Sequence, residues 1–238
     1  MASSDPPPRA LPLSALPLVA GLLPAIAALL ALGLYAGEAG SSCNPFIDDC
    51  VSISRVARHG LATHLFRALV LPGAVLQMLT WLIAAHTFAA AGHTRRDAFL
   101  LALFGVCAGV SLVVYGSFLG IDGSTYRGLR RWGTVIYFGG TYLAMLIFAR
   151  ASQRLHVAHW LVLPRIHGRV MLALLFFIAA TALFNVFTSV VSPALQDRIE
   201  NQTEWWGSLA LTLNFVTMAS LWRRWGLVAT TSLQRAGR

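Results

Sequence analysis

The chain has 238 residues, of which 57% are hydrophobic and only 11% are charged. A soluble domain carries about 25% charged residues, so this composition excludes a globular domain that faces water on all sides. The net charge of +9 comes from arginines scattered between apolar stretches, without a basic stripe of interleaved aromatics, so nucleic-acid binding is excluded as well.

Six stretches of the sequence are long and apolar enough to cross a bilayer, whose hydrocarbon core of about 30 Å needs about 20 helical residues. They hold almost no charge and use about half of the chain, which leaves only short loops and tails. We therefore predict an all-α fold, a polytopic membrane helix bundle with six transmembrane helices and a single domain over residues 1–238. The stretches are about Leu11–Tyr35, Ala68–Ala91, Ala98–Ile121, Trp132–Ala149, Val170–Val191 and Trp205–Trp222.

The segments between these stretches alternate in charge along the chain. One set holds eleven Arg and two acidic residues, and the other holds seven Arg and seven acidic residues. The positive-inside rule predicts that the first set faces the cytoplasm. We expect a multi-pass protein of the cell membrane, such as a bacterial inner membrane, with cytoplasmic tails (1–10 and 223–238) and an outer loop at about 37–67. The first set is residues 5–9, 93–97, 150–169 and 223–238, and the second is 38–67, 122–131 and 197–204.

Two cysteines, Cys43 and Cys50, lie in the outer loop, and the third, Cys107, lies inside an apolar stretch. On the oxidising side of a membrane such a pair is expected to form a disulfide. A redox-active pair usually has the spacing Cys-x-x-Cys and a neighbour that stabilises a thiolate, whereas the neighbours here are Asp48 and Asp49. We predict a structural disulfide, with unpaired thiols or a redox pair as the alternatives.

Basic residues gather just before the second apolar stretch. Read as one helix, residues 52–67 place Arg55 and His59 four residues apart, with Arg58 and Arg67 nearby. Such a cationic ridge, together with free backbone N–H groups, suits the headgroup of an anionic lipid or another phosphate. The alternative is a solvated interfacial segment that nearby aspartates neutralise.

Arg67 lies closest to the apolar stretch. An unpaired charge at full bilayer depth costs about 2.5–3.5 kcal/mol, so its side chain should snorkel to the interface or find a partner. Asp122 and Glu204 are the candidate partners on the same side.

The turn at 122–131 adds three arginines to the outer face. Positive charge is unfavourable there, so we expect these arginines to bind phosphate or to pair with the acidic residues Asp48, Asp49 and Glu204. A plain surface turn is the alternative. The arginines are Arg127, Arg130 and Arg131.

Histidines and buried polar residues do not predict a metal or haem site. A transmembrane haem needs two histidines at matched depth, but only His86 lies well inside a stretch, and zinc needs three convergent ligands. We expect neither metal nor cofactor. Gln77, Asn185 and Asn214 lie within stretches and are expected to join helices by hydrogen bonds.

Short motifs in the outer loop and before the last stretch resemble those of a known family. They are Asn-Pro-Phe-Ile (44–47), Val-Ser-Ile-Ser-Arg (51–55) and Glu-Trp (204–205). With six spans, the chain resembles the DRAM/FRAG/SFK-type membrane proteins, which include damage-regulated autophagy modulators and a Golgi protein of GPI-anchor lipid remodelling. The resemblance covers the architecture of nearly the whole chain and implies a six-helix fold and a role in lipid handling, usually without an agreed catalytic residue.

The motif match carries over only a few positions, and the cysteine pair and the dense arginine ridge are not part of the family pattern. A bacterial source would make a role in GPI-lipid chemistry impossible, which leaves the substrate open. The matched positions are Ser52, Ile53, Ser54, Glu204 and Trp205.

The leading hypothesis is an integral membrane protein that binds or senses an anionic lipid headgroup at its outer face. One alternative is an intramembrane enzyme acting on lipid bonds, with His59 or His64 as general base and Ser52 or Ser54 nearby. Another is a non-catalytic subunit or scaffold that docks on a membrane-protein partner. The expected ligand-binding residues are Arg55, Arg58, His59, Arg67, Arg127, Arg130 and Arg131, supported by Asp48, Asp49, Ser52, Ser54 and Glu204.

Overall fold

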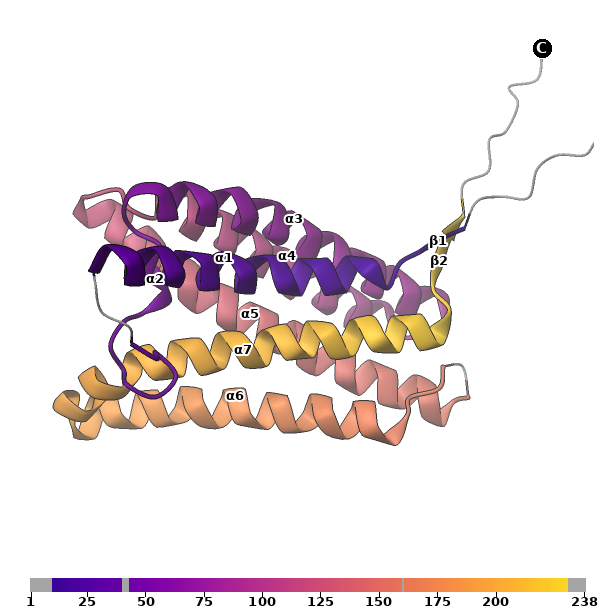
Figure 1. Ribbon diagram of the computed structural model, residues 1–238. Coiled ribbons are helices and arrows are strands. Elements are labelled where there is room, and N and C mark those ends of the chain that lie inside the picture. Colours follow the sequence, from indigo (N-terminus) through magenta and orange to yellow (C-terminus); the bar gives the residue numbers. More distant parts are fainter. Residues whose placement is uncertain (1–9, 40–42, 160, 231–238) are drawn as a thin grey trace, which may run out of the picture.

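The computed structural model describes residues 10–39, 43–159 and 161–230 (Figure 1). Within these ranges the chain is all-helical apart from one pair of short strands, which confirms the all-α part of the prediction. The helices are α1 (Ala15–Ala39), α2 (Ile53–Val56), α3 (Gly60–Ala90), α4 (Arg95–Phe118), α5 (Ser124–Val157), α6 (Arg165–Val191) and α7 (Pro193–Trp225), and the strands are β1 (Ala10–Pro12) and β2 (Val228–Thr230).

Five described helices, α1, α3, α4, α5 and α6, are long and apolar enough to cross a membrane. Their exposed residues are largely apolar, as a surface in contact with lipid requires. The sixth predicted stretch lies in α7, which is not among the five. The first part of α7 is polar, and its second part mixes Trp, Ser, Thr and Asn with aliphatic residues.

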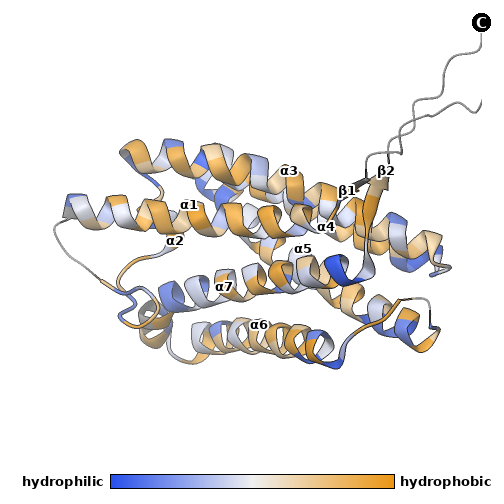
Figure 2. Ribbon diagram, turned by 45° about the vertical axis from the view of Figure 1, so that its right-hand side comes forward, coloured by the Kyte–Doolittle hydropathy of each residue, from blue (hydrophilic) through white to orange (hydrophobic). Residues whose placement is uncertain are grey.

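The long helices form a bundle in which neighbours in sequence mostly pack side by side. Helix α3 packs between α1 and α4, α4 packs on α5, and α7 packs on both α1 and α6. In Figure 1, α5 runs obliquely behind α7 and reaches α6 at one end of the bundle. Hydrophilic residues gather toward the helix ends, while the helix middles are mainly hydrophobic (Figure 2).

The two ends of the bundle differ in what they carry. At the terminal end, β1 pairs antiparallel with β2, and the Leu13 N–H donates to the Leu227 carbonyl at 3.0 Å. The first and last described segments therefore lie together at one end. The opposite end, called the loop end below, carries residues 43–59, the α4–α5 turn and the α6–α7 junction (Figure 1).

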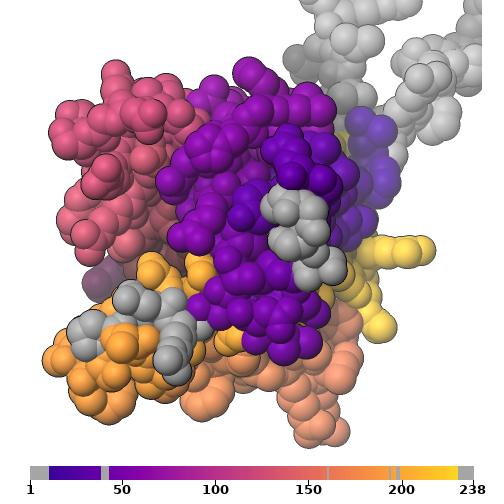
Figure 3. Space-filling view, turned by 60° about the vertical axis from the view of Figure 1, so that its left-hand side comes forward, coloured from indigo at the N-terminus to yellow at the C-terminus, as the bar shows by residue number. Residues whose placement is uncertain are grey.

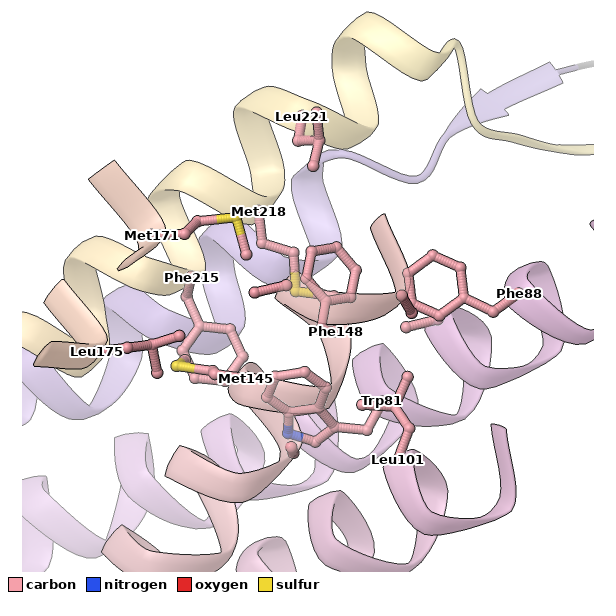
Figure 4. Packing of buried hydrophobic residues seen from close by; sticks show 14 of the residues in the cluster. Trp81, Phe88, Leu101, Met145, Phe148, Met171, Leu175, Phe215, Met218 and Leu221 are labelled. Atoms are coloured by element: carbon pink, nitrogen blue, oxygen red, sulfur yellow. The ribbon is translucent and has the colours of Figure 1, made fainter. Parts of the chain in front are cut away.

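The larger hydrophobic core lies between α3, α5 and α7, where aromatic and methionine side chains interlock (Figure 4). Trp81 and Phe215 pack with ring centroids 5.4 Å apart, and Phe88 lies 5.2 Å from Phe148. Gly105 of α4 lies against Trp81, where a Cβ atom would overlap the indole. A smaller core at the loop end surrounds Val51, Phe66, Leu119 and Trp205.

Several helix boundaries differ from the predicted ones. Residues 52–67 do not form one helix: α2 ends at Val56, and α3 begins at Gly60, whose φ of 56° is accessible to glycine. The predicted ridge is therefore broken, with Arg55 on α2 and His59 at the N-cap of α3. Helices α5 and α7 continue through the predicted turns at 122–131 and 197–204, beginning at Ser124 and Pro193.

Candidate functional site at the loop end

The loop between α1 and α2 folds back on itself. Cys43 and Cys50 lie at disulfide distance with their Cα atoms 6.4 Å apart, in agreement with the predicted pair. Asp48 accepts the Asn44 N–H at 2.9 Å, which closes the turn inside the loop. The third cysteine, Cys107, is free.

This loop is docked on the first part of α7 by hydrogen bonds that no pattern in the sequence indicates. Figure 3 turns the loop end toward the viewer and shows the violet loop segment against the orange helices. The Phe46 ring packs on both Trp205 and Trp206, at 5.6 and 5.2 Å between centroids. The donors on α7 are Asn201 Nδ2 to the Asp49 carbonyl (3.0 Å), Gln202 N to Asp49 Oδ1 (3.1 Å), Gln202 Nε2 to the Ile47 carbonyl, Trp205 Nε1 to the Val51 carbonyl (2.9 Å) and Trp206 Nε1 to the Phe46 carbonyl (3.0 Å).

The acidic residues Asp48 and Asp49 bond to backbone groups of the loop and of α7, and they do not pair with the arginines. Asp48 and Asp49 accept backbone N–H groups, so the prediction that they pair with the ridge is wrong. Among the residues that the structure describes, ion pairs occur only at the terminal end, where Asp97 lies 3.1 Å from Arg154 and 3.2 Å from His93. The described arginines of the loop end thus have no carboxylate of a described side chain within 4.0 Å.

Two of the predicted ligand-binding arginines are occupied by the backbone. Arg67 donates from Nε to the Gly116 carbonyl at 3.1 Å and from Nη2 to the Leu119 carbonyl. Arg130 donates to the Phe118 carbonyl at 3.1 Å and to that of Ile121. These carbonyls end α4, where the last turn of a helix lacks intrahelical donors and its dipole favours a cation. The expected partners of Arg67, Asp122 or Glu204, are not its partners.

The other predicted basic residues remain available. Arg55, His59, Arg127 and Arg131 are exposed. Arg58 is half-buried, and its Nε is enclosed without a hydrogen-bond partner in the described chain. The backbone holds Arg58 beside the α4–α5 turn, because its carbonyl would lie 2.6 Å from a Cβ placed on Gly120, which has a φ of 80°.

The predicted serines lie at the start of α2, next to Arg55 in the sequence. Ser52 caps α2 by accepting the Arg55 N–H at 3.2 Å, and its hydroxyl lies 3.1 Å from that of Ser54. These contacts give both serines a structural role at the start of α2. No hydrogen bond among the described residues joins them to His59 or to His64, so no nucleophile–base pair is assembled here.

Glu204 lies just before the apolar part of α7 and faces the start of α2. Burial raises the pKa of this carboxyl to about 7. The backbone N–H groups of Ile53 and Ser54 lower the pKa in part, and the neighbouring Glu200 raises it. Glu204 therefore exchanges its proton near neutral pH.

Beneath the docked loop, α1, α3, α4, α5 and α7 line a partly open cavity of about 110 Å³. Its walls are mainly apolar, and Phe46, Ile53 and Trp205 line it at the loop end. Gln77, Tyr115, Tyr137 and Glu204 are polar groups that also line it. From the sequence, Gln77 is predicted only as a contact between helices, because hydropathy and spacing do not reveal where five helices leave space.

The remaining polar predictions have mixed outcomes. Gln77 joins α3 to α1, as expected, but the amides of Asn185 and Asn214 bond within their own helices, to Thr181 and Ala210. Over the ranges that the structure covers, no three His, Cys, Asp or Glu residues lie close enough to hold a metal ion.

Comparison with known proteins gives no relative from which a function could be transferred. No protein-family model matches the chain, and no curated protein or solved structure matches it significantly.

Proposed function

We propose that the protein is an integral membrane protein that crosses the bilayer six times and binds the headgroup of an anionic lipid at its loop end. The observation that carries the proposal is uncompensated positive charge: Arg55, Arg58, Arg127 and Arg131 have no carboxylate partner among the described residues. A phosphate is the ligand that guanidinium groups recognise best, through paired N–H donors.

The sixth crossing is supported by the pairing of the two chain ends. Chain ends that lie together on one side of a bilayer favour an even number of crossings. Five apolar helices give an odd number, which supports α7 as a sixth crossing. Its mixed composition is compatible with this role because it packs on α1 and α6 and buries Phe215, Met218 and Trp222 inside the bundle.

The charge of the connections supports an outer position for the loop end. Among the described residues the terminal end holds eight Arg and one acidic residue and the loop end seven of each, so the positive-inside rule favours the cytoplasm for the terminal end. An oxidising outer compartment also suits the Cys43–Cys50 pair. A role in lipid handling or its regulation is in keeping with the resemblance to the DRAM/FRAG/SFK-type proteins.

The hydrogen bonds of Arg67 and Arg130 to backbone carbonyls reduce the set of residues expected to bind the headgroup. Arg67 and Arg130 stabilise the end of α4, and the headgroup site consists of Arg55, Arg58, Arg127 and Arg131, with His59 beside them. The lipid-enzyme alternative draws no support from the described contacts of Ser52, Ser54, His59 and His64.

The test is lipid retention by the detergent-purified protein, measured by native mass spectrometry with phosphatidylglycerol and phosphatidylcholine. The wild type should retain phosphatidylglycerol preferentially, and a variant with Arg55, Arg58, Arg127 and Arg131 changed to Gln should lose that preference. The matched control changes four exposed arginines of the terminal end to Gln and should retain it. Equal retention in both variants would refute the site. The control arginines are Arg95, Arg96, Arg223 and Arg224.

A further inference from the structure

The deep end of the cavity is organised by a proline in α1. Pro24 has no N–H, so the carbonyl four residues earlier, that of Ala20, lacks its intrahelical donor. Gln77 of α3 supplies the missing donor, from Nε2 to the Ala20 carbonyl at 3.0 Å. Because a carbonyl can only accept, this bond fixes which end of the Gln77 amide is nitrogen and which is oxygen.

The fixed orientation leaves one acceptor free. Gln77 is 1% exposed, and its Oε1 has no hydrogen-bond partner among the described residues. A buried amide oxygen without a donor carries a desolvation cost, so the position calls for a donor from outside the protein. The residue lines the cavity.

Beside this acceptor lies one free donor. The Tyr137 oxygen accepts a second bond from Gln77 Nε2, at 3.4 Å, which leaves the hydroxyl proton of Tyr137 to be donated. No acceptor for that proton is present among the described residues, and Tyr137 also lines the cavity. The deep end therefore presents an acceptor and a donor joined through one amide.

The rest of the cavity is mainly apolar, and its volume of about 110 Å³ is smaller than the roughly 150 Å³ cavity that holds benzene, so it takes only the first few carbon atoms of a hydrocarbon chain. On α7 the lining runs from Glu204 to Phe215, eleven residues or about 16 Å along the helix axis. Between these points the walls include Val70, Leu112 and Phe138. A hydrocarbon chain that moves from the bilayer into this space exchanges apolar contacts with lipid for apolar contacts with the protein.

We propose that this cavity is a binding site for a lipid alcohol, whose hydroxyl group lies between Gln77 and Tyr137, whose first few carbon atoms fill the apolar part of the cavity, and whose remaining chain leaves through the open side past the exposed Leu29. A hydroxyl donates to Gln77 Oε1 and accepts from the Tyr137 hydroxyl at the same time. A carboxylate has no proton for Gln77, and an ammonium group has no acceptor for Tyr137 and carries a costly buried charge. The site is separate from the arginines of the headgroup site.

The experiment compares hexadecanol with hexadecane as probes for the detergent-purified full chain, with bound probe counted by native mass spectrometry. The wild type should bind hexadecanol at least about tenfold more tightly than hexadecane, as two hydrogen bonds imply. Tyr137→Phe keeps the ring and should lose most of this preference. The matched control is Tyr142→Phe on the same helix, whose residue does not line the cavity and which should behave as wild type.

A cavity-filling variant locates the binding. Ser208→Phe places an aromatic ring in the cavity and should reduce binding of both probes, which adhesion of the probe to the outer surface would not do. Equal affinity for the two probes, or an unchanged preference in Tyr137→Phe, would overturn the proposal. Water would then be the hydrogen-bond partner of Gln77 and Tyr137. Either result leaves phosphatidylglycerol retention by the arginines untouched, so the two proposals fail separately.

Discussion

The guanidinium of Arg67 donates to the carbonyl of Gly116, 49 positions later in the chain, at 3.1 Å. This bond joins the start of α3 to the end of α4 and places a cation at the negative end of the α4 dipole. With the second bond, to Leu119, Arg67 caps the C-terminal end of α4, where the backbone supplies only the long bond of 3.4 Å from the Leu119 N–H to the Gly116 carbonyl.

Removing this cap should destabilise the bundle. In Arg67→Ala the buried Leu119 carbonyl loses its donor and the buried Gly116 carbonyl keeps only the Leu119 N–H at 3.4 Å, so we expect a loss of about 1–3 kcal/mol in the free energy of unfolding. Thermal unfolding in detergent measures it. Arg127→Ala, which removes an exposed arginine from the same end, should leave the melting temperature nearly unchanged. Equal melting temperatures for the two variants would contradict the capping role.

Arg67 also shows what could be predicted from the sequence. Its position beside an apolar stretch correctly indicates that the charge needs a partner. The sequence does not identify that partner, because a backbone carbonyl becomes available only where a helix ends, and the end of α4 depends on Gly120 and on packing against Arg58. A pattern of charges along the sequence indicates only acidic residues as partners for an arginine. The predicted partners of Arg67 are therefore carboxylates.

The helices themselves follow from composition, since long apolar segments must be helical in a bilayer. The lengths of α5 and α7 were underestimated because hydropathy marks the apolar part of a helix and not its polar ends. The docking of the outer loop on Asn201–Trp206 was missed for a similar reason: amide and indole donors carry no periodic signal.

The cysteine pair should stabilise the docked loop. Changing Cys43 and Cys50 to Ser removes a closed loop of eight residues, for which the chain-entropy estimate is about 2.5 kcal/mol. We therefore expect a lower melting temperature and faster proteolysis of the loop. Treatment of the wild type with a reductant should have the same effect. Cys107→Ser, which changes the free cysteine, is the control, and a double Cys variant as stable as this control would disprove the contribution.

The raised pKa of Glu204 makes stability depend on pH. The carboxyl has a pKa of about 7 in the folded chain and 4.5 as the ordinary value, so the folded state binds the proton more tightly. Between these values the folded state holds more protons than the unfolded state, and stability falls as the pH rises from 4.5 to about 7. The melting temperature should therefore be higher at pH 5 than at pH 8.

Glu204→Gln tests this assignment because it mimics the protonated carboxyl at every pH. The variant should lose most of the difference in melting temperature between pH 5 and pH 8, and at pH 8 it should be more stable than the wild type. Glu200→Gln changes an exposed neighbour and should keep most of the pH dependence. A dependence of wild-type size in Glu204→Gln would assign it to other groups.

The bond from Gln77 to Ala20 should exist because of Pro24, and a double-mutant cycle can measure this dependence. Gln77→Leu leaves the buried Ala20 carbonyl without a donor and should cost about 1–3 kcal/mol. In a Pro24→Ala background, residue 24 has an N–H that can reach Ala20 along the helix, so the same change should cost less. We expect a coupling of about 1 kcal/mol between the two sites. Asn214→Leu is the matched control, because the Asn214 amide bonds within its own helix and should show no coupling to Pro24→Ala. If Gln77→Leu costs the same in both backgrounds, the amide does not act as the substitute for the missing N–H of Pro24.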